Sequence, residues 1–269
     1  MKSPTKKSGF TLVELAIVLV IIGLIIGGVL VGADLIKAAS IRSAVTDMEK
    51  FNAGATAFRG KYNGLPGDLT ASRAVEFNLA ATGDTNSTGL AGLRDGNGAI
   101  EGGAAGATAL NGETALFWKD LGATGLIAGT YTAIGIVPGP SAAVDGSNVR
   151  TYLPGTKLRD SASYYAYARL GRNYFYIANL TAAITTGALG NTAGVTPLEA
   201  KGIDEKIDDG APTTGTVLSM TDLTPPFAGA AVGTTVCNSN ATPSVYNVSS
   251  ANTGAPENVV CQLQVRTSF

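Results

Sequence analysis

The sequence predicts an α+β fold in which one long N-terminal helix packs on a small antiparallel β-sheet domain. An apolar run at residues 10–33 continues into an amphipathic stretch without proline, which indicates a single long helix. Residues 163–180 carry the clearest alternating β pattern in the chain. The length of 269 residues is enough for one or two domains with a real hydrophobic core.

The composition excludes several functional classes. The chain has no histidine, so it contains no Ser-His-Asp or Cys-His triad and lacks the commonest metal ligand. Its formal net charge of −1 argues against a general nucleic-acid-binding role, and no specific nucleic-acid partner is predicted. Asp204, Asp208 and Asp209 cluster with Glu205 and could bind a cation, but solvated acids at a turn are the default expectation. Paired carboxylates alone are weak evidence for a hydrolase. We therefore predict that the protein is not an enzyme.

The N-terminal segment has the charge pattern of a membrane-spanning helix with a cytoplasmic leader. Residues 1–9, MKSPTKKSG, hold three lysines and no acid, and Glu14 is the only charged residue within 10–33. As a helix, residues 10–33 would span roughly 36 Å, which is enough to cross a hydrocarbon layer of about 30 Å. The lysines should keep residues 1–9 in the cytoplasm, so the rest of the chain would be exported.

Three interpretations fit this segment. It could be a plain transmembrane anchor or a secretory signal cleaved near residues 38–40, although the apolar run is longer than a signal-peptide core. The third interpretation rests on the sequence GFTLVEL at residues 9–15, which resembles the processing site of type IV pilins and type II secretion pseudopilins. The resemblance covers residues 6–40. It rests on the basic leader and, in order, on Gly9, Phe10, Thr11, Leu12 and Glu14.

The resemblance implies a pilin-like fold and a structural role. Prepilin peptidase would cut after Gly9 and methylate the new amine of Phe10. A carboxylate in hydrocarbon costs about 2.5–3.5 kcal/mol, so Glu14 needs a partner or a role. In the family, this glutamate pairs with the N-terminal amine of a neighbouring subunit, which would neutralise both charges. The alternative is that Glu14 reaches the lipid headgroups.

The same resemblance implies partners and a location. The partners would be copies of the chain or related pilins, prepilin peptidase, the pilus or secretion assembly machinery, and inner-membrane lipid. The chain would be a single-pass protein of the bacterial inner membrane, with its body in the periplasm, before it enters a cell-surface or periplasmic filament. Two alternative functions stay open: a pseudopilin of a type II secretion system, and a membrane-anchored adhesin or binding module.

Residues 34–60 are predicted to form the amphipathic half of the long helix, and residues 61–269 the exported globular domain. Gly60 is expected to end the helix. The apolar stripe consists of Ala44, Met48, Phe51, Ala55 and Phe58, which recur at alternating spacings of four and three residues.

Within the globular domain, local signals predict several elements. The segment GETALFWKDL should form a helix capped by Asn111, with Trp118 in the core. Residues 131–137 could form a strand, and residues 163–180 should form a hairpin whose tyrosines pack on a helix. Thr196-Pro197-Leu198-Glu199 predicts a helix start with a capping box. Residues 259–265 are expected to form the last strand.

The globular domain also contains a candidate calcium loop, and Ca²⁺ is the cofactor that it could bind. The spacing of its oxygen ligands is that of an EF-hand, but no flanking helices are evident and such runs are more often ordinary turns. The candidate ligands are Asp84, Asn86, Thr88 and Asp95.

The two cysteines are the second notable feature of this domain. Cys237 and Cys261 enclose 23 residues, and in an exported chain two cysteines most simply form a disulfide. Closing a loop of that length would contribute about 3 kcal/mol to stability. The family resemblance agrees, because many pilins close a C-terminal loop in this way. The alternative is a pair of free, buried thiols.

Overall fold

The computed structural model describes residues 11–79, 94–102, 112–132, 148–169, 171–179, 193–219, 237–238, 245–248 and 258–269. The chain divides into two compact units, Met1–Ser40 and Ile41–Phe269. Helix α1, Leu12–Tyr62, has 51 residues and contributes to both units, as the sequence predicts for a single long helix. The domain boundaries expected after residues 9, 33 and 60 stay predictions.

Helix α1 ends two residues later than expected. Gly60 stays helical, and Asn63, with a φ of 53°, takes the left-handed conformation that follows the last turn. Aromatic packing explains the extension. The ring of Tyr62 lies 4.4 Å from that of Phe58 and 4.8 Å from that of Phe77, so ending the helix earlier would remove a buried ring from this cluster.

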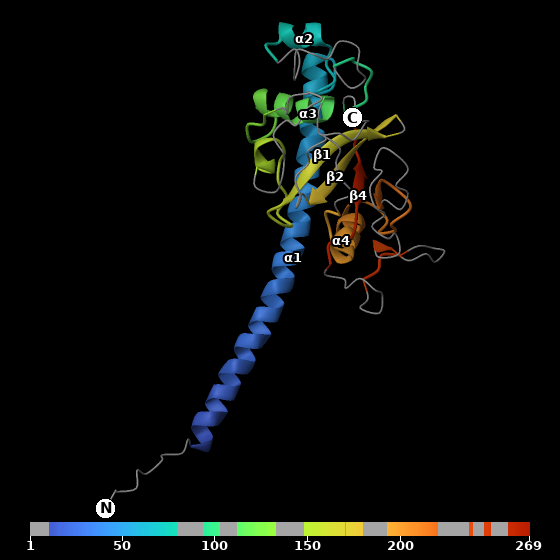
Figure 1. Ribbon diagram of the computed structural model, residues 1–269. Coiled ribbons are helices and arrows are strands. Elements are labelled where there is room, and N and C mark those ends of the chain that lie inside the picture. The colour runs from blue at the N-terminus through green and yellow to red at the C-terminus, as the bar shows by residue number, and fades with distance from the viewer. Residues whose placement is uncertain are drawn as a thin grey trace, which may run out of the picture. The chain divides into compact units, whose positions relative to one another are not determined.

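The second unit contains a four-stranded antiparallel sheet in the order β1-β2-β4-β3 (Figure 1). Strands β1, Ala162–Arg169, and β2, Arg172–Asn179, form the predicted hairpin with eight paired positions. Strand β4, Leu263–Arg266, is shorter than the expected 259–265 and pairs with β2. Strand β3, Val217–Ser219, has three residues and was not predicted.

An aromatic core joins α1, the sheet and helix α3, Gly112–Ala123. The ring of Phe51 lies 4.9 Å from Trp118, 5.2 Å from Tyr164 and 5.9 Å from Phe175, in each case edge to face. Trp118 and Tyr164 are both fully buried. This confirms that Trp118 belongs to the core and that the tyrosine-rich hairpin packs on a helix.

Three shorter elements complete the described part of the second unit. They are α2, Ala71–Glu76, the 3₁₀ helix η1, Val149–Thr151, and α4, Pro197–Ile207. Helix α4 begins with the predicted capping box: the backbone N–H of Glu199 donates to the Thr196 side chain, and the N–H of Thr196 donates to the Glu199 carboxylate. Of the strand expected at 131–137, residues 133–137 lie outside the described residues, as does the expected cap Asn111.

Candidate functional site

The N-terminal part of α1 presents apolar side chains on every face. Among the described residues, α1 is the one helix with the length and apolarity to cross a membrane. The large apolar side chains between Leu12 and Ile36 are 46% to 86% exposed. A helix that is apolar all round needs lipid or other protein around it, because its own chain leaves this surface open to water.

Glu14 lies in the first turn of α1 and forms a capping box with Thr11. The backbone N–H and the hydroxyl of Thr11 both donate to Glu14 Oε2 at 2.8 Å, and the N–H of Glu14 donates to Thr11 Oγ1 at 3.3 Å. The carboxylate is therefore held at the N-terminal end of the helix. Sequence reasoning missed this role of Thr11, although the pattern Thr-x-x-Glu before an apolar run is its signal. The processing residues Gly9 and Phe10 lie outside the described residues.

Four glycines on the same part of α1 have open space where a side chain would lie. A Cβ atom built on any of them would meet no other atom within 4 Å. Each glycine costs about 0.5–1 kcal/mol relative to alanine in a helix, so their presence points to close packing against something outside the chain. The four are Gly23, Gly27, Gly28 and Gly32.

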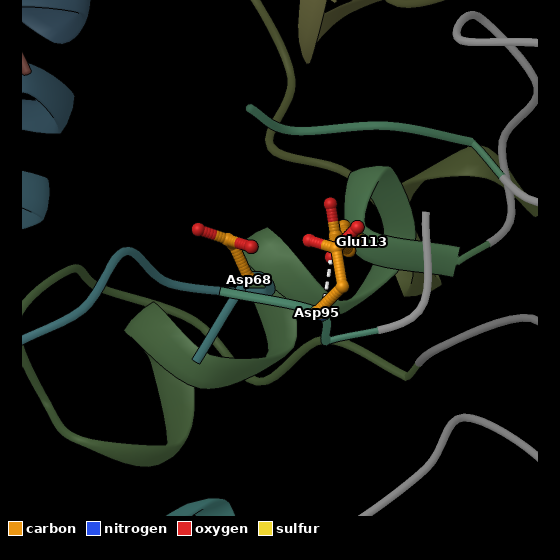
Figure 2. A group of neighbouring side chains, drawn as sticks. All are labelled: Asp68, Asp95 and Glu113. Carbon is orange, nitrogen blue, oxygen red and sulfur yellow. Dashed lines mark hydrogen bonds between the residues drawn. The ribbon is translucent and has the colours of Figure 1, made fainter. Parts of the chain in front are cut away.

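In the second unit, Asp95 joins two buried acids in a cluster of three carboxylates (Figure 2). Asp68 comes from the loop after α1 and Glu113 from the first turn of α3. One oxygen from each of Asp68, Asp95 and Glu113 lies within 4.8 Å of the others. The remaining expected calcium ligands, Asp84, Asn86 and Thr88, lie outside the described residues.

Backbone amides hold the two buried acids of this cluster. Asp68 accepts hydrogen bonds from the N–H groups of Gly96, Asn97 and Gly98, at 2.8, 3.1 and 2.8 Å. Glu113 accepts from the N–H groups of residues 95 and 101, at 3.2 and 3.0 Å. These bonds tie the segment 94–102 to the loop after α1 and to α3.

Burial raises the pKa of both acids. The pKa of Asp68 rises to about 6 and that of Glu113 to about 8, chiefly because each carboxylate is removed from water. The negative charge of Asp95 raises both pKa values further, and the backbone N–H donors oppose the shift. Glu113 therefore keeps its proton at neutral pH, whereas Asp68 is mostly ionised there. The oxygen atoms of the cluster are also of the type that could hold a divalent cation. Calcium binding stays a prediction.

A second acidic group lies at the end of α4, and it corrects one expectation. Asp204, Asp208 and Asp209 place carboxylate oxygens within 4.8 Å of one another. The prediction that Asp204 is solvated is wrong, because its side chain is fully buried. Its Oδ2 accepts a hydrogen bond of 2.8 Å from the Tyr246 hydroxyl. The tyrosine comes from the segment between the two cysteines, which sequence spacing does not bring next to α4.

Cys237 and Cys261 form a disulfide bond, with their Cα atoms 4.9 Å apart. Both are buried, and Cys261 also forms an isolated β-bridge with Val195, just before α4. The disulfide therefore fastens the segment of Tyr246 to the strand region that leads into β4. The predicted pairing is confirmed, and the alternative of two free thiols is excluded.

Comparison with protein-family models gives a match on the N-terminal segment. Residues 4–30 match the prokaryotic N-terminal methylation motif, which is the signature of type IV pilins and pseudopilins. The match includes Glu14 and three of the four glycines described above, Gly23, Gly27 and Gly28. The chain has no significant match among curated proteins or among solved structures.

Proposed function

We propose that the chain is a structural subunit of a type IV pilus-like filament. Prepilin peptidase cuts it after Gly9 and methylates Phe10, and the mature subunit leaves the bacterial inner membrane to enter the filament. The observation that carries this proposal is the methylation motif at residues 4–30, located on a helix whose apolar surface is exposed. Lipid covers that surface before assembly, and neighbouring copies of the helix cover it afterwards.

The geometry of Glu14 supports a role at subunit contacts. Its carboxylate is held at the N-terminal end of α1 by Thr11, the residue that follows Phe10 in the sequence. A cationic amine from a neighbouring subunit would neutralise this carboxylate in the apolar filament core, where an unpaired charge is costly. The hydrogen bonds from Thr11, which lie within one chain, orient the Glu14 carboxylate for this contact with a neighbouring subunit.

The exposed glycines support close packing of helices in the filament. With no Cβ atom and open space around each of them, two helices could approach backbone to backbone at Gly27 and Gly28. The assembly machinery supplies the energy for extraction from the membrane. A pseudopilin of a type II secretion system carries the same motif and would use these residues in the same way.

The decisive experiment is N-terminal sequencing by mass spectrometry of the protein extracted from membranes. We expect N-methylphenylalanine, derived from Phe10, as the first residue of the mature chain. An intact Met1, or cleavage near residues 38–40, would contradict the proposal. Electron microscopy of cells with and without the gene then separates a pilus from a secretion pseudopilus, because loss of abundant surface filaments is expected for a pilus subunit.

Glu14→Val tests the pairing role. The variant should still insert into the membrane and be processed, but filaments should be lost, because the amine would be buried without a partner. Glu49→Gln is the matched control, since Glu49 is an exposed acid on the same helix within the second unit. Normal filaments from Glu14→Val would refute the pairing role. They would not bear on the processing site, which the sequencing experiment tests separately.

A further inference from the structure

The second unit contains a hollow of about 600 Å³ that is lined by arginines. Four of the nine arginines in the chain line it, and the described lining residues include no lysine. They come from separate parts of the fold: the last turns of α1, helix α2, the start of β2 and the end of β4. The four are Arg59, Arg73, Arg172 and Arg266. Their convergence gives the hollow a strongly cationic wall.

These arginines lack the carboxylate partners that two other arginines of the second unit have. Arg94 forms an ion pair with Asp120 and Arg159 one with Glu199, each at 2.8 Å. Within the described part of the chain, none of the four lining arginines forms a salt bridge. Arg73 Nε is buried and has no hydrogen-bond partner there. A buried donor without an acceptor costs free energy, and the described residues supply no acceptor for this atom.

The acid in the lining does not neutralise the arginines. Asp68 is the only acidic side chain among the described lining residues, and both of its oxygens accept backbone N–H groups of residues 96–98. Among the described lining side chains, four arginines therefore face a single carboxylate. The hollow therefore attracts negative charge.

The wall of the hollow is braced by Asn173 in β2. Its Oδ1 accepts the N–H of Ile100 at 2.9 Å, and its Nδ2 donates to the carbonyl oxygen of Gly98 at 3.0 Å. Its own carbonyl oxygen accepts the N–H of Thr267 at 3.0 Å. One residue thus links β2, the segment 94–102 and the C-terminal segment, which lies beside α1 through a hydrogen bond from Ser268 to Asn52 (Figure 1). Such a preformed site loses little entropy when a ligand binds.

The size and polarity of the hollow define the ligand. A volume of about 600 Å³ is much larger than one inorganic oxyanion needs and falls in the range of small-molecule sites. The apolar side chains in the lining are few, namely Leu65, Leu69 and Phe269, so the ligand should be polar throughout. Arginine forks match the oxygens of phosphate and sulfate esters, which carry up to two negative charges.

We propose that this hollow binds a sugar ester of phosphate or sulfate, with the arginines holding the oxyanion and the polar wall facing the sugar hydroxyls. The site would give the filament subunit a binding function in its body, separate from the assembly function of the N-terminal helix. The proposal therefore does not depend on processing or on filament formation.

The test is calorimetric titration of the full chain in non-ionic detergent, with glucose 6-phosphate, inorganic phosphate and glucose as the three probes. We expect glucose 6-phosphate to bind, added salt to weaken its binding, and glucose to give no signal. Arg73→Gln and Arg172→Gln should each weaken binding by about tenfold or more, because each removes charge-assisted hydrogen bonds. Arg42→Gln is the matched control, since Arg42 is exposed on α1 outside the hollow and should leave the affinity unchanged.

Three outcomes would overturn the proposal: no binding of either anion, equal affinity in the Arg172→Gln variant, or equal affinity for inorganic phosphate and glucose 6-phosphate. Equal affinity for the two anions would show that the hollow binds a free oxyanion and does not recognise the sugar. Arg172 is exposed at the hairpin turn, so its variant should fold even if Arg73→Gln does not. Thermal melting of each variant checks this directly.

Discussion

Arg94 and Asp120 form a bidentate ion pair in the interior of the body, with both side chains only 1% exposed. The two guanidinium nitrogens donate to the two carboxylate oxygens at 2.9 and 2.8 Å. Asp120 Oδ2 also accepts the backbone N–H of Gly67 at 2.8 Å. One carboxylate on α3 therefore fixes two otherwise irregular segments, the loop after α1 and the segment 94–102.

Asp120→Ala should destabilise the body by about 3–5 kcal/mol, because it leaves the Arg94 guanidinium buried without its counter-ion. Chemical denaturation followed by tryptophan fluorescence measures this loss, since Trp118 is in the same helix and fully buried. Lys50→Ala is the control. It removes a surface ion pair with Asp47 and should cost less than about 1 kcal/mol. Similar losses in the two variants would show that the buried pair has no special role.

Gly67 and Gly60 should respond in opposite ways to alanine. Gly67 has a φ of +81°, and a Cβ atom there would lie 2.4 Å from the carbonyl oxygen of Glu113. Gly67→Ala should therefore destabilise the body by about 2 kcal/mol or more. Gly60 is helical with open space around it, so Gly60→Ala should be neutral or stabilise by about 0.5–1 kcal/mol. Melting temperatures of the two variants test this, and a stable Gly67→Ala protein would contradict the close approach of this loop to α3.

The elements that the sequence predicts well are those with short-range causes. The hairpin follows from alternating tyrosines around Gly171, and the start of α4 follows from the capping pattern between Thr196 and Glu199. The length of α1 follows from an apolar run that continues into an amphipathic stripe. In these cases the residues that decide the structure lie within a few positions of one another.

The features that were missed depend on contacts between distant residues. Asp68 and Glu113 lie 45 positions apart, so spacing alone does not place them beside Asp95. The disulfide was predictable because two cysteines in an exported chain have only one possible pairing, but the contact of Tyr246 with Asp204 depends on how that closed loop packs. Strand β3 has only three residues, which is too short for a period-two pattern to be recognised.

The raised pKa of Glu113 predicts that the folded second unit is more stable at low pH than at high pH. Its pKa is about 8 in the folded chain against 4.5 when unperturbed, so the folded state binds the extra proton between these values. The contribution of Glu113 to the free energy of unfolding should therefore fall as pH rises from about 4.5 to 8, and level off above. The neighbouring acids Asp68 and Asp95 act in the same direction, because their charges disfavour ionised Glu113.

Denaturation curves measured across this pH range test the prediction, because the pH dependence of the variant can be compared with that of the unaltered protein. Glu113→Gln should flatten the pH dependence relative to the unaltered protein, whatever its effect on overall stability. Thr56→Ala should keep the original slope, because Thr56 is exposed on α1 and has no side chain that titrates in this range. An identical slope in Glu113→Gln would show that Glu113 titrates normally in the folded protein.

Calcium would compete with protons for the same carboxylates and would stabilise the fold at the pH where the protons are lost. If the predicted loop and the cluster of Asp68, Asp95 and Glu113 share an ion, calcium should raise the melting temperature at pH 8 and weaken the pH dependence. For an extracellular type of site, with a Kd of about 10⁻⁴–10⁻³ M, a tenfold excess over Kd stabilises by about 1.4 kcal/mol. Asp95→Asn should abolish this gain and Glu49→Gln should retain it. If calcium leaves the melting temperature unchanged, the cluster does not bind calcium and its carboxylates interact only with protons and backbone amides.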